Sequence, residues 1–117
     1  MIPDLGRDMI QLFDIKNGKI EHLGGEQLRK GSGPRHLEFS KKQRVAYVCG
    51  ELDNTVTVLK YNEAEVDRVL QGGHNADTTD KGTSSLLKQI QTVSTVPEDI
   101  NKKSTIAEMR LHPSGRY

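Results

Sequence analysis

The chain has 117 residues, of which 33% are hydrophobic, and its mean hydropathy is −0.65. This length suits one domain, but the hydrophobic content is low for a self-sufficient globule, so we expect an incomplete core. The formal net charge of +1, from 17 basic and 16 acidic residues, predicts neither a nucleic acid nor an anionic membrane as a partner.

The single cysteine, Cys49, lies in an apolar run and has no partner for a disulfide. We interpret it as a small core residue in a reducing compartment. The sequence contains no run of 18 apolar residues, and residues 1–7 lack the basic head and apolar stretch of a signal peptide. These features predict a cytoplasmic location.

Short runs rich in β-branched and aromatic residues alternate with turn formers along the chain. Asn17-Gly18 is a strong signal for a two-residue hairpin turn, and the glycines of residues 24–33 indicate a connection between structural units. The predicted strands are residues 8–15, 20–23, 35–40, 44–49, 55–61, 86–96 and 106–111.

Residues 63–85 interrupt this pattern. Their second half contains no apolar residue larger than alanine, which is typical of a surface loop inserted between two strands. The β-branched Ile90, Thr92, Val93, Thr95 and Val96 favour a strand over a helix after this loop. The sequence therefore predicts about seven short strands and no helix.

A repeat relates the strand at residues 35–40 to the end of the chain. Residues 107–117 follow the pattern of residues 35–45, so His36 corresponds to Glu108 and Arg44 to Arg116, at an offset of 108 − 36 = 72 residues. Repeated four-stranded antiparallel units predict an all-β fold, a partial β-propeller of about two blades. In this interpretation residues 1–30 end one blade, residues 31–97 form a full blade with the inserted loop, and residues 98–117 start the next.

Five motifs in the same order resemble the lactonase family of seven-bladed β-propellers, which includes bacterial propeller-type 6-phosphogluconolactonases and fungal carboxy-muconate lactonizing enzymes. The resemblance covers nearly the whole chain except residues 63–81. The motifs are residues 33–39 (GPRHLEF), residues 46–52 (AYVCGEL), residues 55–58 (TVTV), residues 91–98 (QTVSTVPE) and residues 107–117 (AEMRLHPSGRY).

The resemblance implies an active site in the central cleft, with His36 and Glu108 as the catalytic residues. Opening a lactone needs a base that activates water, which a histidine or a carboxylate can supply, and cationic donors for the developing oxyanion. Arg35 and Arg110 are candidates for those donors or for binding an anionic group of the substrate, and Glu51 is a further binding candidate. Both arginines could instead pair with acidic neighbours such as Glu38 or Glu51.

The predicted function of the full protein is hydrolysis of a sugar lactone, 6-phosphogluconolactone to 6-phosphogluconate, with the remaining blades outside this chain. No two histidines have the spacing of metal ligands, and we expect neither a metal nor an organic cofactor. Two alternatives stay open: formation of a lactone from a muconate, and a propeller without catalytic activity, either a truncated fragment or a binding platform. Substrate profiling distinguishes lactone formation from lactone hydrolysis.

Overall fold

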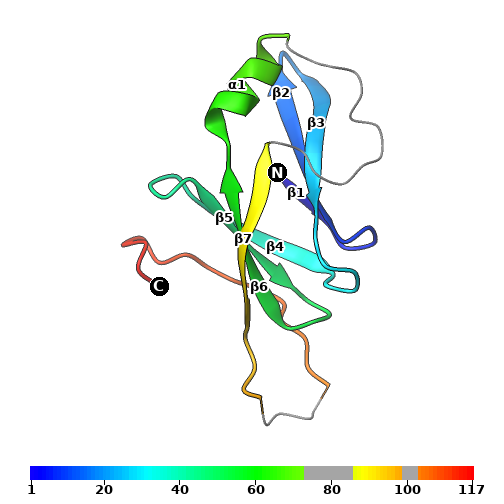
Figure 1. Cartoon of the computed structure of the whole chain (residues 1–117), viewed down its shortest axis with the longest axis vertical. Helices are drawn as coiled ribbons and strands as arrows, with labels where there is room; N and C mark the ends of the chain where they lie inside the picture. Colours follow the sequence, from blue (N-terminus) through cyan, green and yellow to red (C-terminus); the bar gives the residue numbers. More distant parts are fainter. Residues whose placement is uncertain (73–85, 99–102) are drawn as a thin grey trace.

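The computed structural model describes residues 1–72, 86–98 and 103–117. These residues form two antiparallel sheets and one helix (Figure 1). The first sheet has the order β1-β2-β3, with β1 at Ile2–Asp4, β2 at Met9–Lys16 and β3 at Lys19–Gln27. The second has the order β4-β5-β6-β7, with β4 at Pro34–Ser40, β5 at Val45–Gly50, β6 at Thr55–Tyr61 and β7 at Leu87–Ser94. The helix, α1, spans Glu63–Leu70.

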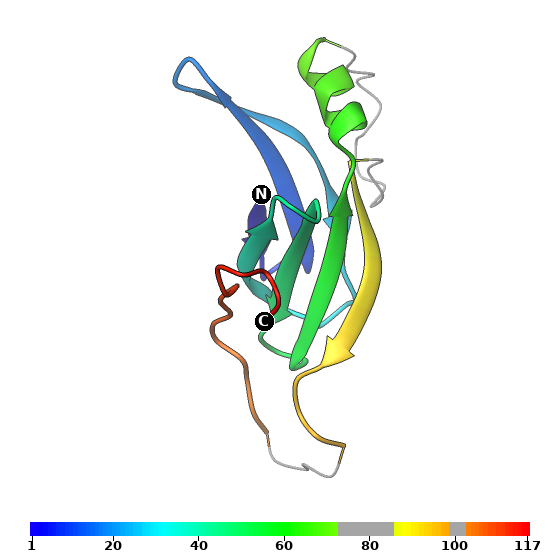
Figure 2. The ribbon, with the colours of Figure 1, turned by 90° about the vertical axis from the view of Figure 1, so that its left-hand side faces the viewer.

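Tight turns set the register of the strands. Asn17 and Gly18 both have positive φ, +53° and +73°, which is the backbone of the predicted two-residue hairpin turn. This turn places Ile15 opposite Ile20, and both side chains are largely exposed, at 74% and 70%. The hairpin of β2 and β3 projects beyond the rest of its sheet (Figure 2).

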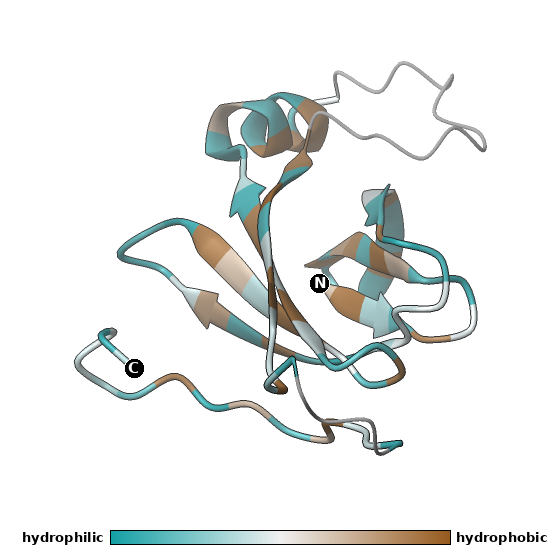
Figure 3. Ribbon diagram, turned by 60° about the horizontal axis from the view of Figure 1, so that its bottom comes forward, coloured by the Kyte–Doolittle hydropathy of each residue, from teal (hydrophilic) through white to brown (hydrophobic). Residues whose placement is uncertain are grey.

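The core lies between the two sheets. Ile10 of β2 and Leu28 pack with side chains of the second sheet in one buried cluster. The other members of this cluster are Ala46, Val48, Leu59 and Leu87. Because strands alternate their side chains between two faces, each sheet contributes one hydrophobic face, and hydrophobic residues are visible along the strands of both sheets (Figure 3).

Helix α1 corrects the prediction that residues 63–85 form a loop and that the chain has no helix. The Asn62 side chain accepts a hydrogen bond from the backbone N–H of Glu65 at 3.2 Å, which caps the first turn. Val66 packs in a second buried cluster, with Leu12, Leu23 and Leu86. The helix therefore closes one end of the space between the sheets. The remainder of the predicted loop, residues 73–85, lies outside the described residues.

Two predicted strands need correction, and one strand was not predicted. Strand β1 was not predicted, and β3 continues to Gln27 instead of ending at residue 23. Gly25 allows this continuation, because a Cβ there would lie 2.5 Å from the Ile10 carbonyl oxygen of the neighbouring strand. The predicted last strand, residues 106–111, is wrong: this segment has no strand ladder within the described chain. A strand in a sheet needs hydrogen bonds to a neighbouring strand. The sequence pattern of one segment does not show whether such a neighbour is present.

Candidate functional site

The first residues of β4 form a β-bulge that carries Arg35 and His36. Pro34 pairs with Gly50 and Leu37 with Val48, so two residues of β4 lie opposite one residue of β5, Cys49. The backbone N–H of His36 donates to the Cys49 Sγ at 3.3 Å. Bulges re-aim side chains and are frequent near active sites. Here the bulge lies on β4, an edge strand of its sheet, where Arg35 is exposed and His36 is half-buried.

Arg35 is held by Glu51, the residue that follows β5. The Arg35 Nη1 lies 2.7 Å from the Glu51 Oε2. The hydrogen bond and the charge of Glu51 both raise the pKa of Arg35. The Glu51 backbone N–H also donates to the Gly33 carbonyl oxygen at 2.9 Å, which ties the end of β5 to the segment before β4. The structure thus brings together two of the predicted binding residues.

Glu108 and Arg110 lie on the C-terminal segment, residues 103–117, which runs beside the second sheet (Figure 2). The Arg110 Nε donates to the Glu108 Oε1 at 2.6 Å, and the Arg110 Nη1 lies 3.5 Å from the Glu38 Oε1 of β4. The segment is also fixed where the Asn54 side chain donates to the Ser104 carbonyl oxygen at 2.8 Å. Arg110 therefore links the C-terminal segment to the same strand that carries His36.

A hollow of about 220 Å³ separates part of this segment from the sheet. Glu38 and Tyr47 line it from the sheet, and Arg110 and Tyr117 line it from the C-terminal segment. Within the described part of the chain, no hydrogen bond or ion pair joins His36 to Glu108. Four of the five predicted site residues thus form two ion pairs, Arg35 with Glu51 and Arg110 with Glu108, and His36 belongs to neither pair.

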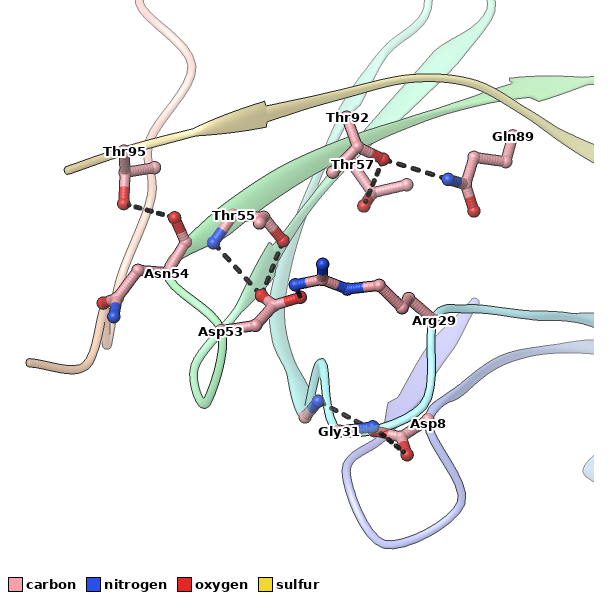
Figure 4. Close-up of polar contacts among 11 residues, drawn as sticks. Asp8, Arg29, Gly31, Asp53, Asn54, Thr55, Thr57, Gln89, Thr92 and Thr95 are labelled. Carbon is pink, nitrogen blue, oxygen red and sulfur yellow. Dashed lines mark hydrogen bonds and ion pairs between the residues drawn. The ribbon is translucent and has the colours of Figure 1, made fainter. Parts of the chain in front are cut away.

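Asp8 supports this region and was missed by the sequence analysis. Its two carboxylate oxygens accept hydrogen bonds from the backbone N–H groups of Gly31 and Gly33, each at 2.8 Å; Figure 4 draws the contact with Gly31. These two bonds lower the pKa of Asp8. No sequence signal marks the contact, because Asp8 is 23 and 25 residues away from its two partners.

Asp53 is a second supporting residue that the sequence analysis missed. Its Oδ2 lies 2.8 Å from the Arg29 Nη2, and its Oδ1 accepts from the Thr55 N–H and hydroxyl at 3.2 and 2.6 Å (Figure 4). Gly50 packs directly on this group, since a Cβ there would lie 2.3 Å from the Asp53 Oδ1. The turn between β5 and β6, which contains Asp53, thus also anchors the segment before β4.

Among residues 1–72, 86–98 and 103–117, no group of three or more His, Cys, Asp or Glu side chains is arranged to hold a metal ion. The same residues contain no helix with the length and apolar character needed to span a bilayer.

The arrangement of the two sheets identifies the structural class of the protein. Two packed antiparallel sheets, one of them a four-stranded meander, form part of a β-propeller. The solved structure of a periplasmic gluconolactonase from Pseudomonas aeruginosa superposes with a TM-score of 0.68 at 26% identity, over 97% of this chain and 28% of that one. The predicted all-β partial propeller is confirmed, with α1 as an addition.

The family model of the lactonases with a seven-bladed β-propeller matches residues 1–117, and the chain belongs to this family. A 6-phosphogluconolactonase of Bacillus subtilis is 30% identical over 114 residues, which cover 97% of this chain and 27% of the relative. A 6-phosphogluconolactonase of Erwinia tasmaniensis is 30% identical over 119 residues, which cover 99% of this chain and 30% of the relative. The chain spans less than a third of the length of these relatives.

Proposed function

We propose that the protein containing this chain is a lactonase that opens the lactone of a sugar acid, with 6-phosphogluconolactone as its substrate. The observation that carries this proposal is the match of the whole chain to the propeller lactonase family. Two relatives at 30% identity are named 6-phosphogluconolactonase, which supports the phosphorylated substrate. The P. aeruginosa protein is named a gluconolactonase, so the role of the phosphate group needs a direct test.

In this proposal residues 1–30, 31–97 and 98–117 belong to three successive blades, and the remaining blades complete the cleft. His36 or Glu108 takes a proton from water, whose oxygen attacks the lactone carbonyl carbon. The negative charge that develops on the carbonyl oxygen needs preorganised cationic donors. The bond from the carbonyl carbon to the ring oxygen then breaks, the ring oxygen takes up a proton, and the open-chain hydroxy acid leaves.

The arginines suit the anionic groups of such a substrate. A guanidinium has five N–H donors, and the Arg35 side chain uses Nη1 for Glu51 while 47% of its surface stays exposed. The Arg110 side chain is 76% exposed although it pairs with Glu108. Each carboxylate therefore fixes the orientation of a guanidinium that keeps donors for a phosphate or a carboxylate.

Hydrolysis by the purified full-length protein tests the proposal. We expect acid release from 6-phosphogluconolactone, slower turnover of gluconolactone, and no lactone formation from a muconate. His36→Ala and Glu108→Ala should each lower kcat by about 100-fold or more, the range of a general base. His22→Ala is the matched control, because His22 lies on the exposed hairpin and contacts Phe13.

Absence of hydrolysis by the intact wild-type protein would contradict the proposed function. Unchanged rates in both the His36→Ala and Glu108→Ala variants would instead refute the assignment of these residues. A cytoplasmic location belongs to the same proposal, and because the P. aeruginosa relative is named as periplasmic, cell fractionation tests location separately.

A further inference from the structure

The carboxylate of Asp8 joins the first sheet to the segment that leads into β4. Its Oδ2 accepts the Gly31 N–H and its Oδ1 accepts the Gly33 N–H, both at 2.8 Å. The backbone carbonyl oxygen of Asp8 accepts the Leu28 N–H at 2.8 Å. Asp8 therefore holds this part of the chain at three places: its backbone carbonyl oxygen binds residue 28, and its carboxylate oxygens bind residues 31 and 33.

The opposite side of this segment is held by the loop after β5. The Leu52 N–H donates to the Ser32 carbonyl oxygen at 3.2 Å, and the Glu51 N–H donates to the Gly33 carbonyl oxygen at 2.9 Å. Gly33 has a φ of +57°, and a Cβ at this position would lie 2.6 Å from the Leu52 Cγ. The segment is thus fixed from two sides immediately before the bulge, and its exit direction determines where the next side chains point.

The bonds of Asp8 depend on its charge. A carboxylate has acceptor positions on both oxygens, whereas an amide has one acceptor oxygen and one NH₂ group that repels a backbone N–H. Hydrogen bonds to an ionised acceptor are about twice as strong as neutral ones. The lowered pKa of Asp8 agrees with a carboxylate that is bound in this way. Asp8→Asn should therefore break one of the two bonds and weaken the other, with little change in side-chain volume.

We propose that Asp8 is a positioning residue, which sets the place of His36 by fixing the backbone of residues 31–33 from the neighbouring blade. His36 lies three residues after Gly33, and its own backbone N–H donates to the Cys49 Sγ across the bulge. Asp8 itself does not contact substrate in this assignment. The kinetic part of the inference rests on the proposed function, because it takes His36 as the base.

The experiment compares Asp8→Asn, in the turn before β2, with Asp14→Asn, a matched change within β2, in the full-length protein. Hydrogen exchange followed by NMR should accelerate at the Gly31 and Gly33 amides by at least about tenfold in Asp8→Asn, the factor given by loss of one charge-assisted bond. The ring resonances of His36 should shift. Asp14→Asn should change neither.

Kinetics on the same variants test the link to His36. Asp8→Asn should lower kcat by about 10- to 100-fold, with a smaller change in KM, because small displacements of a reacting group have costs of this size. In a His36→Ala background, Asp8→Asn should cause little further loss, since residues that act as a unit are not additive.

Unchanged exchange at both glycine amides, or unshifted His36 resonances, would overturn the inference. The inference would also be overturned if Asp8→Asn lowered kcat by the same factor in the His36→Ala background as in the wild type, because Asp8 would then act without His36. If the wild-type protein hydrolyses no lactone, the proposed function fails, and the exchange and resonance measurements still decide whether Asp8 positions His36.

Discussion

The guanidinium of Arg35 and the carboxylate of Glu51 form an ion pair, with 2.7 Å between Nη1 and Oε2, that joins the start of β4 to the residue after β5. Arg35 and Glu51 are 16 residues apart in sequence, and the pairing of β4 with β5 brings them together. Arg35 lies in the same bulge of β4 as His36. It therefore fixes the direction of a cationic side chain at the place where the proposed chemistry occurs.

Glu51→Gln should affect catalysis more than stability. Exposed ion pairs contribute little to folding, so the urea midpoint of the full-length protein should change only slightly. The Arg35 side chain loses its anionic partner and its fixed direction, and KM for 6-phosphogluconolactone should rise several-fold. Urea titration and initial-rate kinetics on the same preparation check this. A large fall in the midpoint with unchanged KM would show that Glu51 serves the fold alone.

Gly50→Ala should destabilise the protein by about 1–3 kcal/mol, the usual cost of forcing an extra methyl group into a packed site. The new Cβ would lie 2.3 Å from the Asp53 Oδ1 and 2.9 Å from the Ser32 carbonyl oxygen. Gly6→Ala is the control, because its Cβ would meet only the Asp4 Oδ1, at 3.8 Å, and a change within about 0.5 kcal/mol is expected there. Chemical unfolding of both variants measures the difference, and equal stabilities would contradict the packing described here.

Asn62→Ala should cost about 1 kcal/mol of stability through loss of the helix cap. The Asn62 side chain accepts the Glu65 N–H at the start of α1, and an alanine leaves this N–H to water. Asn62→Asp keeps the acceptor and should be nearly neutral. Thermal unfolding distinguishes the two variants, and an equal effect of both would indicate that the cap does not stabilise α1.

Glu26 should make the stability of the protein depend on pH. Burial raises the pKa of this carboxyl, and a bond from the Gln89 backbone opposes that shift. A raised pKa means that the folded state binds the proton more tightly than the unfolded state, so stability falls as pH rises from the ordinary value of 4.5 through the raised pKa. Glu26→Gln should therefore stabilise the protein at pH 7 and lose this advantage at low pH.

Urea unfolding at several pH values between about 4 and 8 measures this difference. Glu98→Gln, a change at an exposed glutamate, is the control for removal of one negative charge from the surface. If the stability of Glu26→Gln relative to the wild type fell as pH rose, the fold would stabilise the charged form of Glu26, contrary to this prediction.

Local signals in the sequence were sufficient for some elements. Asn17-Gly18 predicted its turn because a two-residue hairpin needs positive φ at both positions, and both residues have it. The cap of α1 also has a local signal, Asn62 followed three residues later by Glu65, which is a capping pattern. The prediction of a loop rested on the polar composition of the following residues and did not use this signal.

Contacts between distant residues account for what the sequence did not predict. The bulge at His36 depends on the register against Cys49, and the two bonds of Asp8 depend on how the sheets pack. Of the two partners considered for Arg35, the structure selects Glu51, whereas Glu38 pairs with Arg110. The repeat of residues 35–45 at residues 107–117 suggested a strand at residues 106–111. A ladder also requires a neighbouring strand, and the repeat does not specify one.

The exposed pair of Ile15 and Ile20 has a practical consequence for work on this chain. Two isoleucines that face each other across a hairpin, at 74% and 70% exposure, present adjacent apolar surface to water. Such surface drives self-association and lowers solubility. Replacing both isoleucines with threonine keeps the β-branched shape and removes this apolar surface, so we expect less self-association when these 117 residues are produced on their own.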